Sequence, residues 1–321
     1  MRQPLVKLLI SALAAVPLFA AAASPFPTKP IKLIVPFAAG GPADLVARQV
    51  ADTWSSKLGQ PVIIENQGGG MGVVAVNSVI RAPADGHTIL FAASGNVIAQ
   101  PILNGSEAEI AKLAPVSLVT TSPHVLVVTS KLPINSVKDL IAYAKANPGK
   151  VNFGSAGVGG VAHLGMEMFK SMTKTDIVHV PYRGTSQVTK DLIAGDVQAL
   201  FSSLPSLKPL MDTGKIRAIG LTAPTTSSDA KGIPTIAQAG VPGFEYTTWY
   251  ATYVPAGTPQ PIIDKLNSTL REVVANKAVR DKLESQGVEL EGGTPEQLKT
   301  LMQHEATKWK SVIREANVSL N

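Results

Sequence analysis

The chain has 321 residues, no cysteine and a formal net charge of +6 at neutral pH. The absence of cysteine excludes disulfides, thiol nucleophiles and thiolate metal sites. The basic residues are scattered and only 5% of the residues are aromatic, so the chain lacks the basic stripe and the stacking surface of a nucleic-acid-binding protein.

The first 23 residues have the three parts of a secretory signal peptide. They are a basic start with Arg2 and Lys7, an apolar run over residues 8–19, and an alanine-rich end before Ser24. We expect cleavage after Ala23 and export to a bacterial periplasm; a buried apolar first helix is the alternative. Charged residues, glycines or prolines interrupt every later apolar stretch, so we expect no membrane insertion once the signal is removed.

From residue 31 onward, strand and helix patterns alternate. Strands are expected at 31–35, 61–65, 88–92, 115–120, 124–129, 151–154, 177–180, 197–201 and 216–222. Helices are expected at 43–57, 72–82, 136–146, 161–171, 185–194, 206–213 and 234–239, and then at 259–275, 277–286 and 295–316. This alternation predicts an α/β fold with largely parallel sheets.

The length of the exported chain favours two lobes. Extended stretches near 121–125 and 246–253 are the expected crossing points. One lobe would then contain residues 24–124 and 248–321, and the other residues 125–247.

The segment Pro36–Asp44, PFAAGGPAD, joins the first expected strand to the first expected helix. Backbone N–H groups are free at such a junction, and the helix dipole adds partial positive charge, so the turn suits an anion such as a carboxylate. The alternative is a plain tight turn in which Gly41 supplies flexibility and Asp44 only caps the helix.

A second glycine-rich turn, residues 152–163, also leads from a strand to a helix and contains Ser155 and His163. Two such turns in different lobes could hold one anion from both sides. Polar residues after other strands lie on the side where open parallel sheets bind ligands: Ser94, Asn96, Tyr182 and Ser203. Trp249, at the second crossing, either lines the cleft or packs in the hinge core.

Motifs for catalysis and cofactors are missing or incomplete. Residues 70–75 fit a loose dinucleotide fingerprint, but no acidic residue closes the following strand. A phosphate-binding P-loop, a nucleophile elbow and a two-histidine zinc motif are all absent, and the five histidines have no metal-like spacing. We therefore expect no cofactor, no metal and no enzymatic activity.

An ordered set of short motifs covers the chain after the signal. They include PFAAGGPAD at 36–44, ADGHT at 84–88, AKANPGK at 144–150, HVPYRG at 179–184, PTIAQAG at 234–240 and PAGTP at 255–259. In this set the chain resembles the Bug family, the extracytoplasmic solute receptors of tripartite tricarboxylate transporters. It departs from the usual family pattern at residues 66–74 and at His87, Arg183 and Gln238.

The resemblance implies a type II-like periplasmic binding protein, a Venus flytrap whose two lobes are joined by crossing hinge strands. It implies a monomer that binds a small carboxylate, without catalysis, and works with the membrane components of the transporter. The ligand would be a di- or tricarboxylate, an aromatic acid or an acidic amino acid. The residues expected at the ligand, from the resemblance and from the strand ends together, are Phe37, Ala39, Gly41, Asp44, Ser94, Asn96, Ser155, Ala156, Gly157, His163, Tyr182, Ser203 and Trp249.

Two other functions stay open on the sequence. A ligand-presenting receptor for a sensor kinase would have the same fold and site. An exported hydrolase or lyase would use Asp44 and His163 as acid and base.

Overall fold

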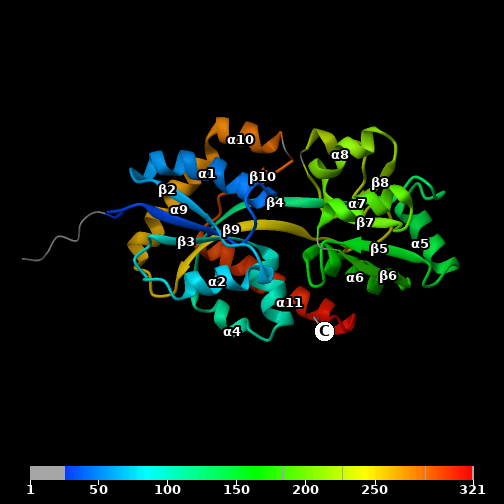
Figure 1. The fold of residues 1–321 in the computed structure, drawn as a ribbon, viewed down its shortest axis with the longest axis horizontal. Coiled ribbons are helices and arrows are strands. Elements are labelled where there is room, and N and C mark those ends of the chain that lie inside the picture. The colour runs from blue at the N-terminus through cyan, green and yellow to red at the C-terminus, as the bar shows by residue number, and fades with distance from the viewer. Residues whose placement is uncertain (1–25, 183, 226, 286, 320–321) are drawn as a thin grey trace, which may run out of the picture.

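The structure is a computed structural model that describes residues 26–319 except 183, 226 and 286. The expected signal peptide, residues 1–23, and its cleavage site therefore lie outside the described residues, as does Arg183. Two α/β lobes lie side by side along the long axis of the molecule (Figure 1). This confirms the predicted two-lobed α/β fold.

Lobe 1, at the left of Figure 1, is built around three parallel strands and has helices on both faces. Its strands are β1 (Ile31–Val35), β2 (Val62–Asn66), β3 (Thr88–Ala93) and the short β10 (Glu289–Leu290). Its helices are α1 (Pro42–Leu58), α2 (Val73–Ile80), α3 (Gln100–Leu103), α4 (Glu107–Ile110), α9 (Gln260–Ala275), α10 (Lys277–Glu284) and α11 (Pro295–Glu315). Short turns η1 (Gly70–Gly72) and η2 (Gly95–Ala99) precede α2 and α3.

Lobe 2 repeats the plan with parallel strands β5, β6 and β7. Its strands are β5 (Val151–Ser155), β6 (Ile177–Pro181), β7 (Ala199–Ser203) and β8 (Ile216–Leu221). Its helices are α5 (Val137–Ala146), α6 (Val161–Thr173), α7 (Thr185–Ala194) and α8 (Leu204–Asp212), with a short turn η3 (Ser228–Ala230).

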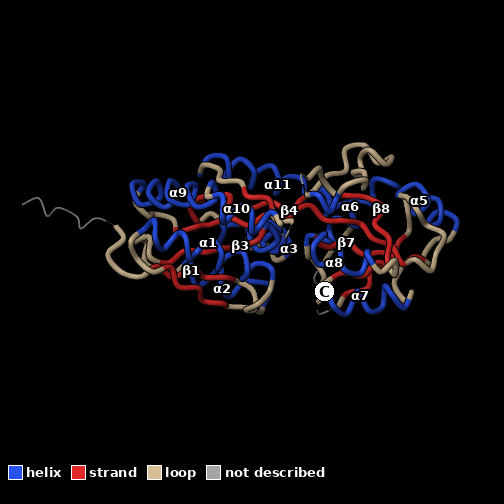
Figure 2. The backbone as a smooth tube through the Cα atoms, turned by 90° about the horizontal axis from the view of Figure 1, so that it is seen from above, coloured by secondary structure: helices blue, strands red, loops and turns tan. Residues whose placement is uncertain are grey.

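Two long antiparallel strands join the lobes (Figure 2). They are β4 (Leu113–Thr129) and β9 (Thr247–Pro255), and the sheet order is β2-β1-β3-β9-β4-β7-β5-β6. The first part of β4 pairs with β9 in lobe 1, and its last part pairs with β7 and β8 in lobe 2. The hinge is therefore part of the sheet.

The hydrophobic core passes through this hinge. Side chains alternate along β9, so that Trp249, Ala251 and Tyr253 all point to one buried face. There they join a cluster that contains Leu90 of lobe 1 and Phe153 of lobe 2. A second cluster lies between the lobe 1 sheet, α1 and α9, and a third lies in lobe 2.

Several helix ends follow directly from the local sequence. Pro42 begins α1, and Gly59 ends it in the left-handed conformation, with φ of 71°. Thr294 and Gln297 form a reciprocal capping box at the start of α11. The helix α6 begins at Val161, and its N-cap, Gly160, makes no side-chain hydrogen bond to the first amides of the helix.

The structure corrects three sequence expectations about the elements. The expected strands at 115–120 and 124–129 are one strand, because β9 continues to pair with β4 from Thr120 to Pro123. Residues 234–239 form no helix, since Ile236 and Pro234 instead hydrogen-bond to the main chain of Leu221. Residues 95–103, for which no element was expected, form η2 and α3.

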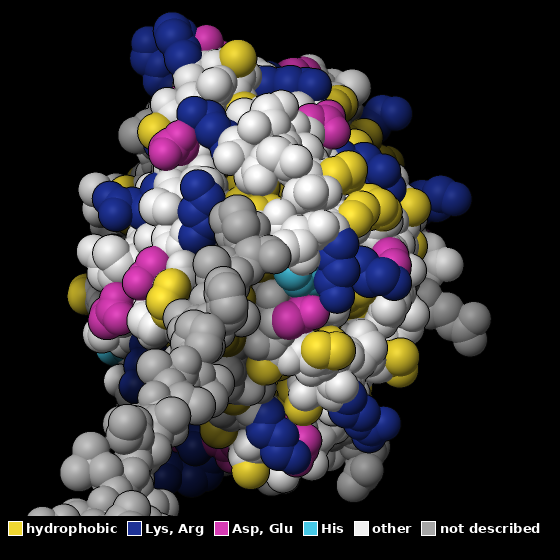
Figure 3. All heavy atoms as spheres, turned by 90° about the vertical axis from the view of Figure 1, so that its left-hand side faces the viewer, with side chains coloured by type: hydrophobic (Ala, Val, Ile, Leu, Met, Phe, Trp, Pro, Cys, Tyr) yellow, Lys and Arg dark blue, Asp and Glu magenta, His cyan; other side chains and the backbone are white. Residues whose placement is uncertain are grey.

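No helix in the described part of the chain is long and apolar enough to cross a membrane. On the face shown in Figure 3, basic and acidic side chains lie interspersed rather than gathered by sign. That face offers no basic stripe of the kind that binds nucleic acid.

Candidate functional site

A cleft of about 1500 Å³ lies between the lobes. Its walls come from both lobes and from the crossing strands. Lining residues fall at 36–46, 66–72 and 93–100 of lobe 1, at 122–124, 248 and 250 of the hinge, and at 155–163, 185, 201–209 and 229 of lobe 2, with 285 and 288 at the rim.

The first turn reaches the cleft through its backbone. Phe37, Ala38 and Ala39 line the cavity. Within the part of the chain that the structure describes, the amides of Ala38 and Ala39 have no protein acceptor. They are hydrogen-bond donors close to the N-terminus of α1, where the helix dipole favours an anion.

Asp44 lies behind this turn and holds it in shape. The carboxylate is 1% exposed and accepts hydrogen bonds from the Gly40 amide at 2.8 Å, from Arg48 Nε at 2.9 Å and from Asn66 Nδ2 at 2.9 Å. Asn66 Nδ2 also donates to the Phe37 carbonyl. The hydrogen bond from Arg48, followed by those from Gly40 and Asn66, outweighs burial and lowers the pKa of Asp44 to about 2.

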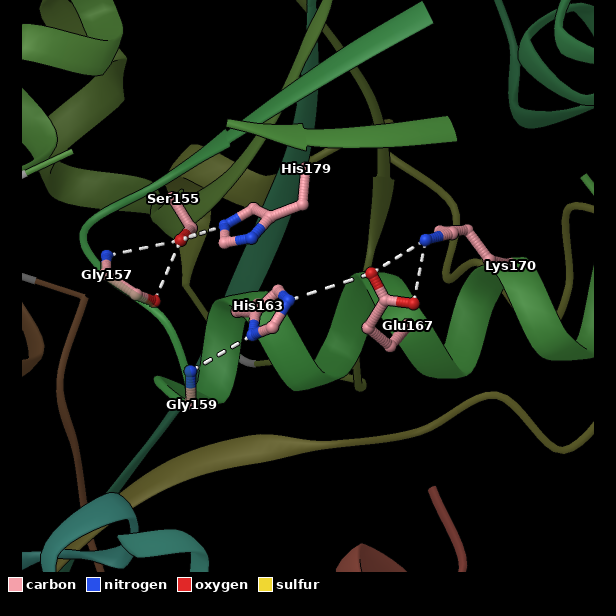
Figure 4. Close-up of polar contacts among 7 residues, drawn as sticks. All are labelled: Ser155, Gly157, Gly159, His163, Glu167, Lys170 and His179. Carbon is pink, nitrogen blue, oxygen red and sulfur yellow. Dashed lines mark hydrogen bonds and ion pairs between the residues drawn. The ribbon is translucent and has the colours of Figure 1, made fainter. Parts of the chain in front are cut away.

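The second turn is organised by Ser155, at the end of β5. Its hydroxyl lies 2.9 Å from the Gly157 carbonyl, accepts from the Gly157 amide at 3.2 Å, and lies 2.6 Å from His179 Nε2 (Figure 4). His163 Nδ1 accepts from the Gly159 amide at 3.0 Å. Among the described residues, the amides of Ala156 and Gly160 have no acceptor, and both residues line the cleft.

His163 and His179 support this turn as uncharged rings. Their ring centroids lie 3.8 Å apart in a stacked arrangement. Burial, then His179, then Lys170 lower the pKa of His163 to about 3, while burial and Lys170 lower that of His179 to about 4. Burial therefore keeps both imidazoles as neutral hydrogen-bonding groups, while Lys170 pairs with Glu167 at 2.8 Å and Glu167 lies 3.7 Å from His163 Nε2 (Figure 4).

The hinge contributes polar and aromatic groups. His124, which lies on β4, contacts Thr248 Oγ1 through Nε2 at 3.0 Å, and burial lowers its pKa to about 4. Tyr250 stacks on Phe91 and lies edge-on to Phe37 at 6.3 Å. His124, Thr248 and Tyr250 all line the cleft.

The expected ligand residues divide into two groups. The structure brings together at the cleft Phe37, Ala39, Asn96, Ser155, Ala156, Gly157, His163 and Ser203. The other expected residues, which do not line it, are Gly41, Asp44, Ser94, Tyr182 and Trp249.

Three of the latter correct the sequence expectation. Trp249 is completely buried. Successive side chains of β9 point to opposite faces of the sheet, so Trp249 points into the core while its neighbours Thr248 and Tyr250 line the cleft. Tyr182 donates its hydroxyl to Asp191 at 2.6 Å instead of facing the cleft. Ser94 is 1% exposed and is not among the residues that line the cavity.

Sequence reasoning missed several residues of the site. They are Asn66, Gln100, His124, His179 and Tyr250. His179 lies in the middle of β6 and takes part in the site through Ser155, so the strand-end rule does not mark it. No local signal marks Gln100, whose side chain donates to the Gly159 carbonyl of the other lobe at 3.4 Å.

Known proteins match this chain over most of its length. The family model described as a tripartite tricarboxylate transporter family receptor matches residues 46–318. The chain belongs to this family. The Bug resemblance seen in the sequence is thereby confirmed. Protein BugT of Bordetella pertussis is 35% identical, over 93% of this chain and 92% of BugT.

Solved structures of similar receptors share the two-lobed fold. Rpa4515 of R. palustris with adipate has a TM-score of 0.81 and 34% identity, covering 92% of this chain and 99% of that chain. MatC from Rhodopseudomonas palustris with bound malate has a TM-score of 0.77 and 31% identity, covering 90% and 100%. This family consists of solute receptors, and among the described residues of this member no cluster of side chains fits a metal ion.

Proposed function

We propose that this chain is a periplasmic receptor that binds a small carboxylate in the interlobe cleft and presents it to the membrane components of a tripartite tricarboxylate transporter. The observation that carries the proposal is that the starts of α1 and α6, one from each lobe, line the same cleft.

The chemistry of the two turns favours a carboxylate. The amides of Ala38 and Ala39 on one side and of Ala156 and Gly160 on the other are available donors within the described structure. Hydrogen bonds from such donors to an ionised acceptor are stronger than neutral ones, and closure of the lobes removes competing water. Adipate and malate, named with the two neighbouring structures, both carry carboxylates.

Lobe closure is the expected response to ligand. We infer that residues 24–124 with 248–321 move against residues 125–247, with the bend within β4 and β9. Gln100 of lobe 1 donates to the Gly159 carbonyl of lobe 2 at 3.4 Å, so a bound ligand would add its contacts to an existing one between the lobes.

The residues of the enzyme alternative are poorly suited to acid–base catalysis at neutral pH. Asp44 is occupied by three donors and has its pKa lowered to about 2 by Arg48 and its other partners. Burial lowers the pKa of His163 to about 3, and its Nδ1 already accepts the Gly159 amide. A general acid or base works best with a pKa near the operating pH.

Titration calorimetry with adipate, malate and hexanoate tests the proposal, with NMR of each acid after overnight incubation. We expect at least one acid to bind and to be recovered unchanged. Ser155→Ala should weaken that binding about tenfold, because the hydroxyl fixes Gly157, whereas Ser130→Ala, which removes an exposed hydroxyl bonded to Gly214, should not. Absence of binding by every acid, or consumption of the bound acid, would overturn the proposal.

A further inference from the structure

We propose that the cleft selects a carboxylate with a single acid group and an apolar body, such as a medium-chain or aromatic acid, over di- and tricarboxylates. This inference rests on the proposed function, because it assumes that the two turns hold the acid group. It concerns the part of the cleft beyond those turns.

Large apolar side chains stand uncovered in the wall of the cleft. Leu45 of α1 is 46% exposed and Met71 of η1 is 45% exposed, and both line the cavity. Val161 at the start of α6 lines the same cavity from the other lobe, and Phe37 and Tyr250 add aromatic rings to the lining. Exposed apolar surface gathered in a concave site is typical of a binding surface for an apolar group.

The backbone at Met71 is held in an unfavourable conformation. Met71 has φ of 53°, in the left-handed region that residues other than glycine rarely adopt, and Gly72 follows with φ of 87°. Asn96 Nδ2 donates to the Met71 carbonyl at 2.9 Å, and a Cβ at Gly72 would lie 2.5 Å from that same nitrogen. A strained backbone conformation persists only where the surrounding structure holds it, and such residues cluster at ligand-binding sites.

Among the residues that the structure describes, the lining of the cleft has no unpaired cation to match a second carboxylate. Among the described lining residues, Lys208 is the only lysine or arginine. Its ammonium group is already paired, because it donates to both carboxylate oxygens of Asp212, at 2.5 and 2.6 Å. His124 and His163 are neutral at pH 7, since burial lowers their pKa to about 4 and about 3. Asp229 also lines the cavity and would repel a second acid group. Burying an unpaired carboxylate against apolar side chains is strongly unfavourable.

Hexanoate and adipate provide a matched comparison, because both have six carbons and differ in the second acid group. We expect calorimetry on the full chain without its signal to give at least about tenfold tighter binding of hexanoate than of adipate, with citrate weaker still. Binding of adipate or citrate as tight as that of hexanoate would overturn this inference and leave the proposed function standing. Failure of these three acids and of malate would instead overturn the proposed function.

Lysine substitutions test whether Leu45 and Met71 form the apolar wall that contacts the ligand. Leu45→Lys and Met71→Lys each place a cation at the apolar wall, and each should shift the preference toward adipate by at least about tenfold. Val74→Lys is the control, because Val74 is 62% exposed on the adjoining helix and does not line the cleft. A similar shift in the control, or none in the other two, would overturn the assignment of this wall. Leu45 lies in a regular helix, so its variant does not depend on how Met71 tolerates change.

Discussion

His163 and His179 stack with ring centroids 3.8 Å apart, although one comes from a helix and the other from a strand. Each ring fixes part of the same turn, His163 through the Gly159 amide and His179 through Ser155. Two protonated rings could not remain in such contact without strong repulsion. The shape of the turn is therefore linked to the uncharged state of both histidines.

Together with His124, which is also buried, these two histidines predict a loss of stability in mild acid. In the folded protein, burial is the main cause that lowers the pKa values of His124, His163 and His179 to about 4, 3 and 4, from the usual 6.5 of histidine. As pH falls, the unfolded chain therefore takes up protons on these histidines before the folded protein does. The free energy of unfolding is highest above pH 6.5 and decreases from there toward pH 4. Each histidine contributes up to about 1.4 kcal/mol per pH unit.

Urea titrations between pH 7.5 and 4.5 measure this dependence. His124→Asn should give a smaller slope of unfolding free energy against pH than the wild-type protein. His304→Gln is the control, because His304 is exposed on α11 and should leave the slope unchanged. A wild-type stability that stays constant over this pH range would contradict the assignment.

Asp44→Asn should loosen the first turn. The substitution removes the ion pair with Arg48 and weakens the hold on Gly40, which should cost about 1–3 kcal/mol and weaken carboxylate binding. Since the hydrogen bond from Arg48 and its other partners lower the pKa of Asp44 to about 2, this contribution is complete at neutral pH and is lost only as pH falls toward 2. Thermal unfolding and calorimetry measure both effects.

Asp52→Asn is the matched control for that variant, because Asp52 is exposed on the same helix. It removes the same charge without touching the turn. Equal effects of the two substitutions on binding would mean that the charge, and not the geometry of the turn, is what matters.

Gly72→Ala should damage the wall that presents Met71. Alanine at a φ of 87° costs about 1–2 kcal/mol, and its Cβ would also displace Asn96. Gly59→Ala has a comparable left-handed conformation, with φ of 71°, but nothing lies within 4 Å of its added Cβ. We expect both variants to melt earlier and only Gly72→Ala to bind hexanoate more weakly. Unchanged binding by Gly72→Ala would show that the loop tolerates displacement.

Gln100→Ala should favour separation of the lobes. It removes the contact between α3 and Gly159, so the unliganded protein should show a larger radius of gyration in solution scattering. Affinity should fall about fivefold, because a smaller fraction of the protein is ready to bind. Gln303→Ala, at an exposed position of α11, should change neither quantity.

Regular elements could be predicted from the sequence because their signals are local. The hydrophobic runs of β1 and β3 and the terminal signals of α1 and α11 lie within a few residues of the elements they define. The break assumed between residues 120 and 124 is absent, because the partner strand β9, more than a hundred residues away, supplies the pairing there.

Site residues could be predicted where they belong to a strand-to-helix turn. The turn after β5 predicts Ser155 near the ligand on that basis, and Ser155 lines the cleft, whereas Ala39 is expected there from the family resemblance. Trp249 was not placed correctly, since one step in strand register decides between cleft and core. Gln100 was missed because its role depends on contact with another lobe, which no local pattern encodes.

The core that runs through Trp249 has a consequence for unfolding. Leu90 and Phe153 belong to one contiguous cluster although they lie in different lobes, and β4 and β9 pair along the strands that join them. Neither lobe can lose its packing without exposing part of the other, so the two should melt together. Calorimetry should show a single heat-absorption peak whose van't Hoff and calorimetric enthalpies agree, as for a one-domain protein.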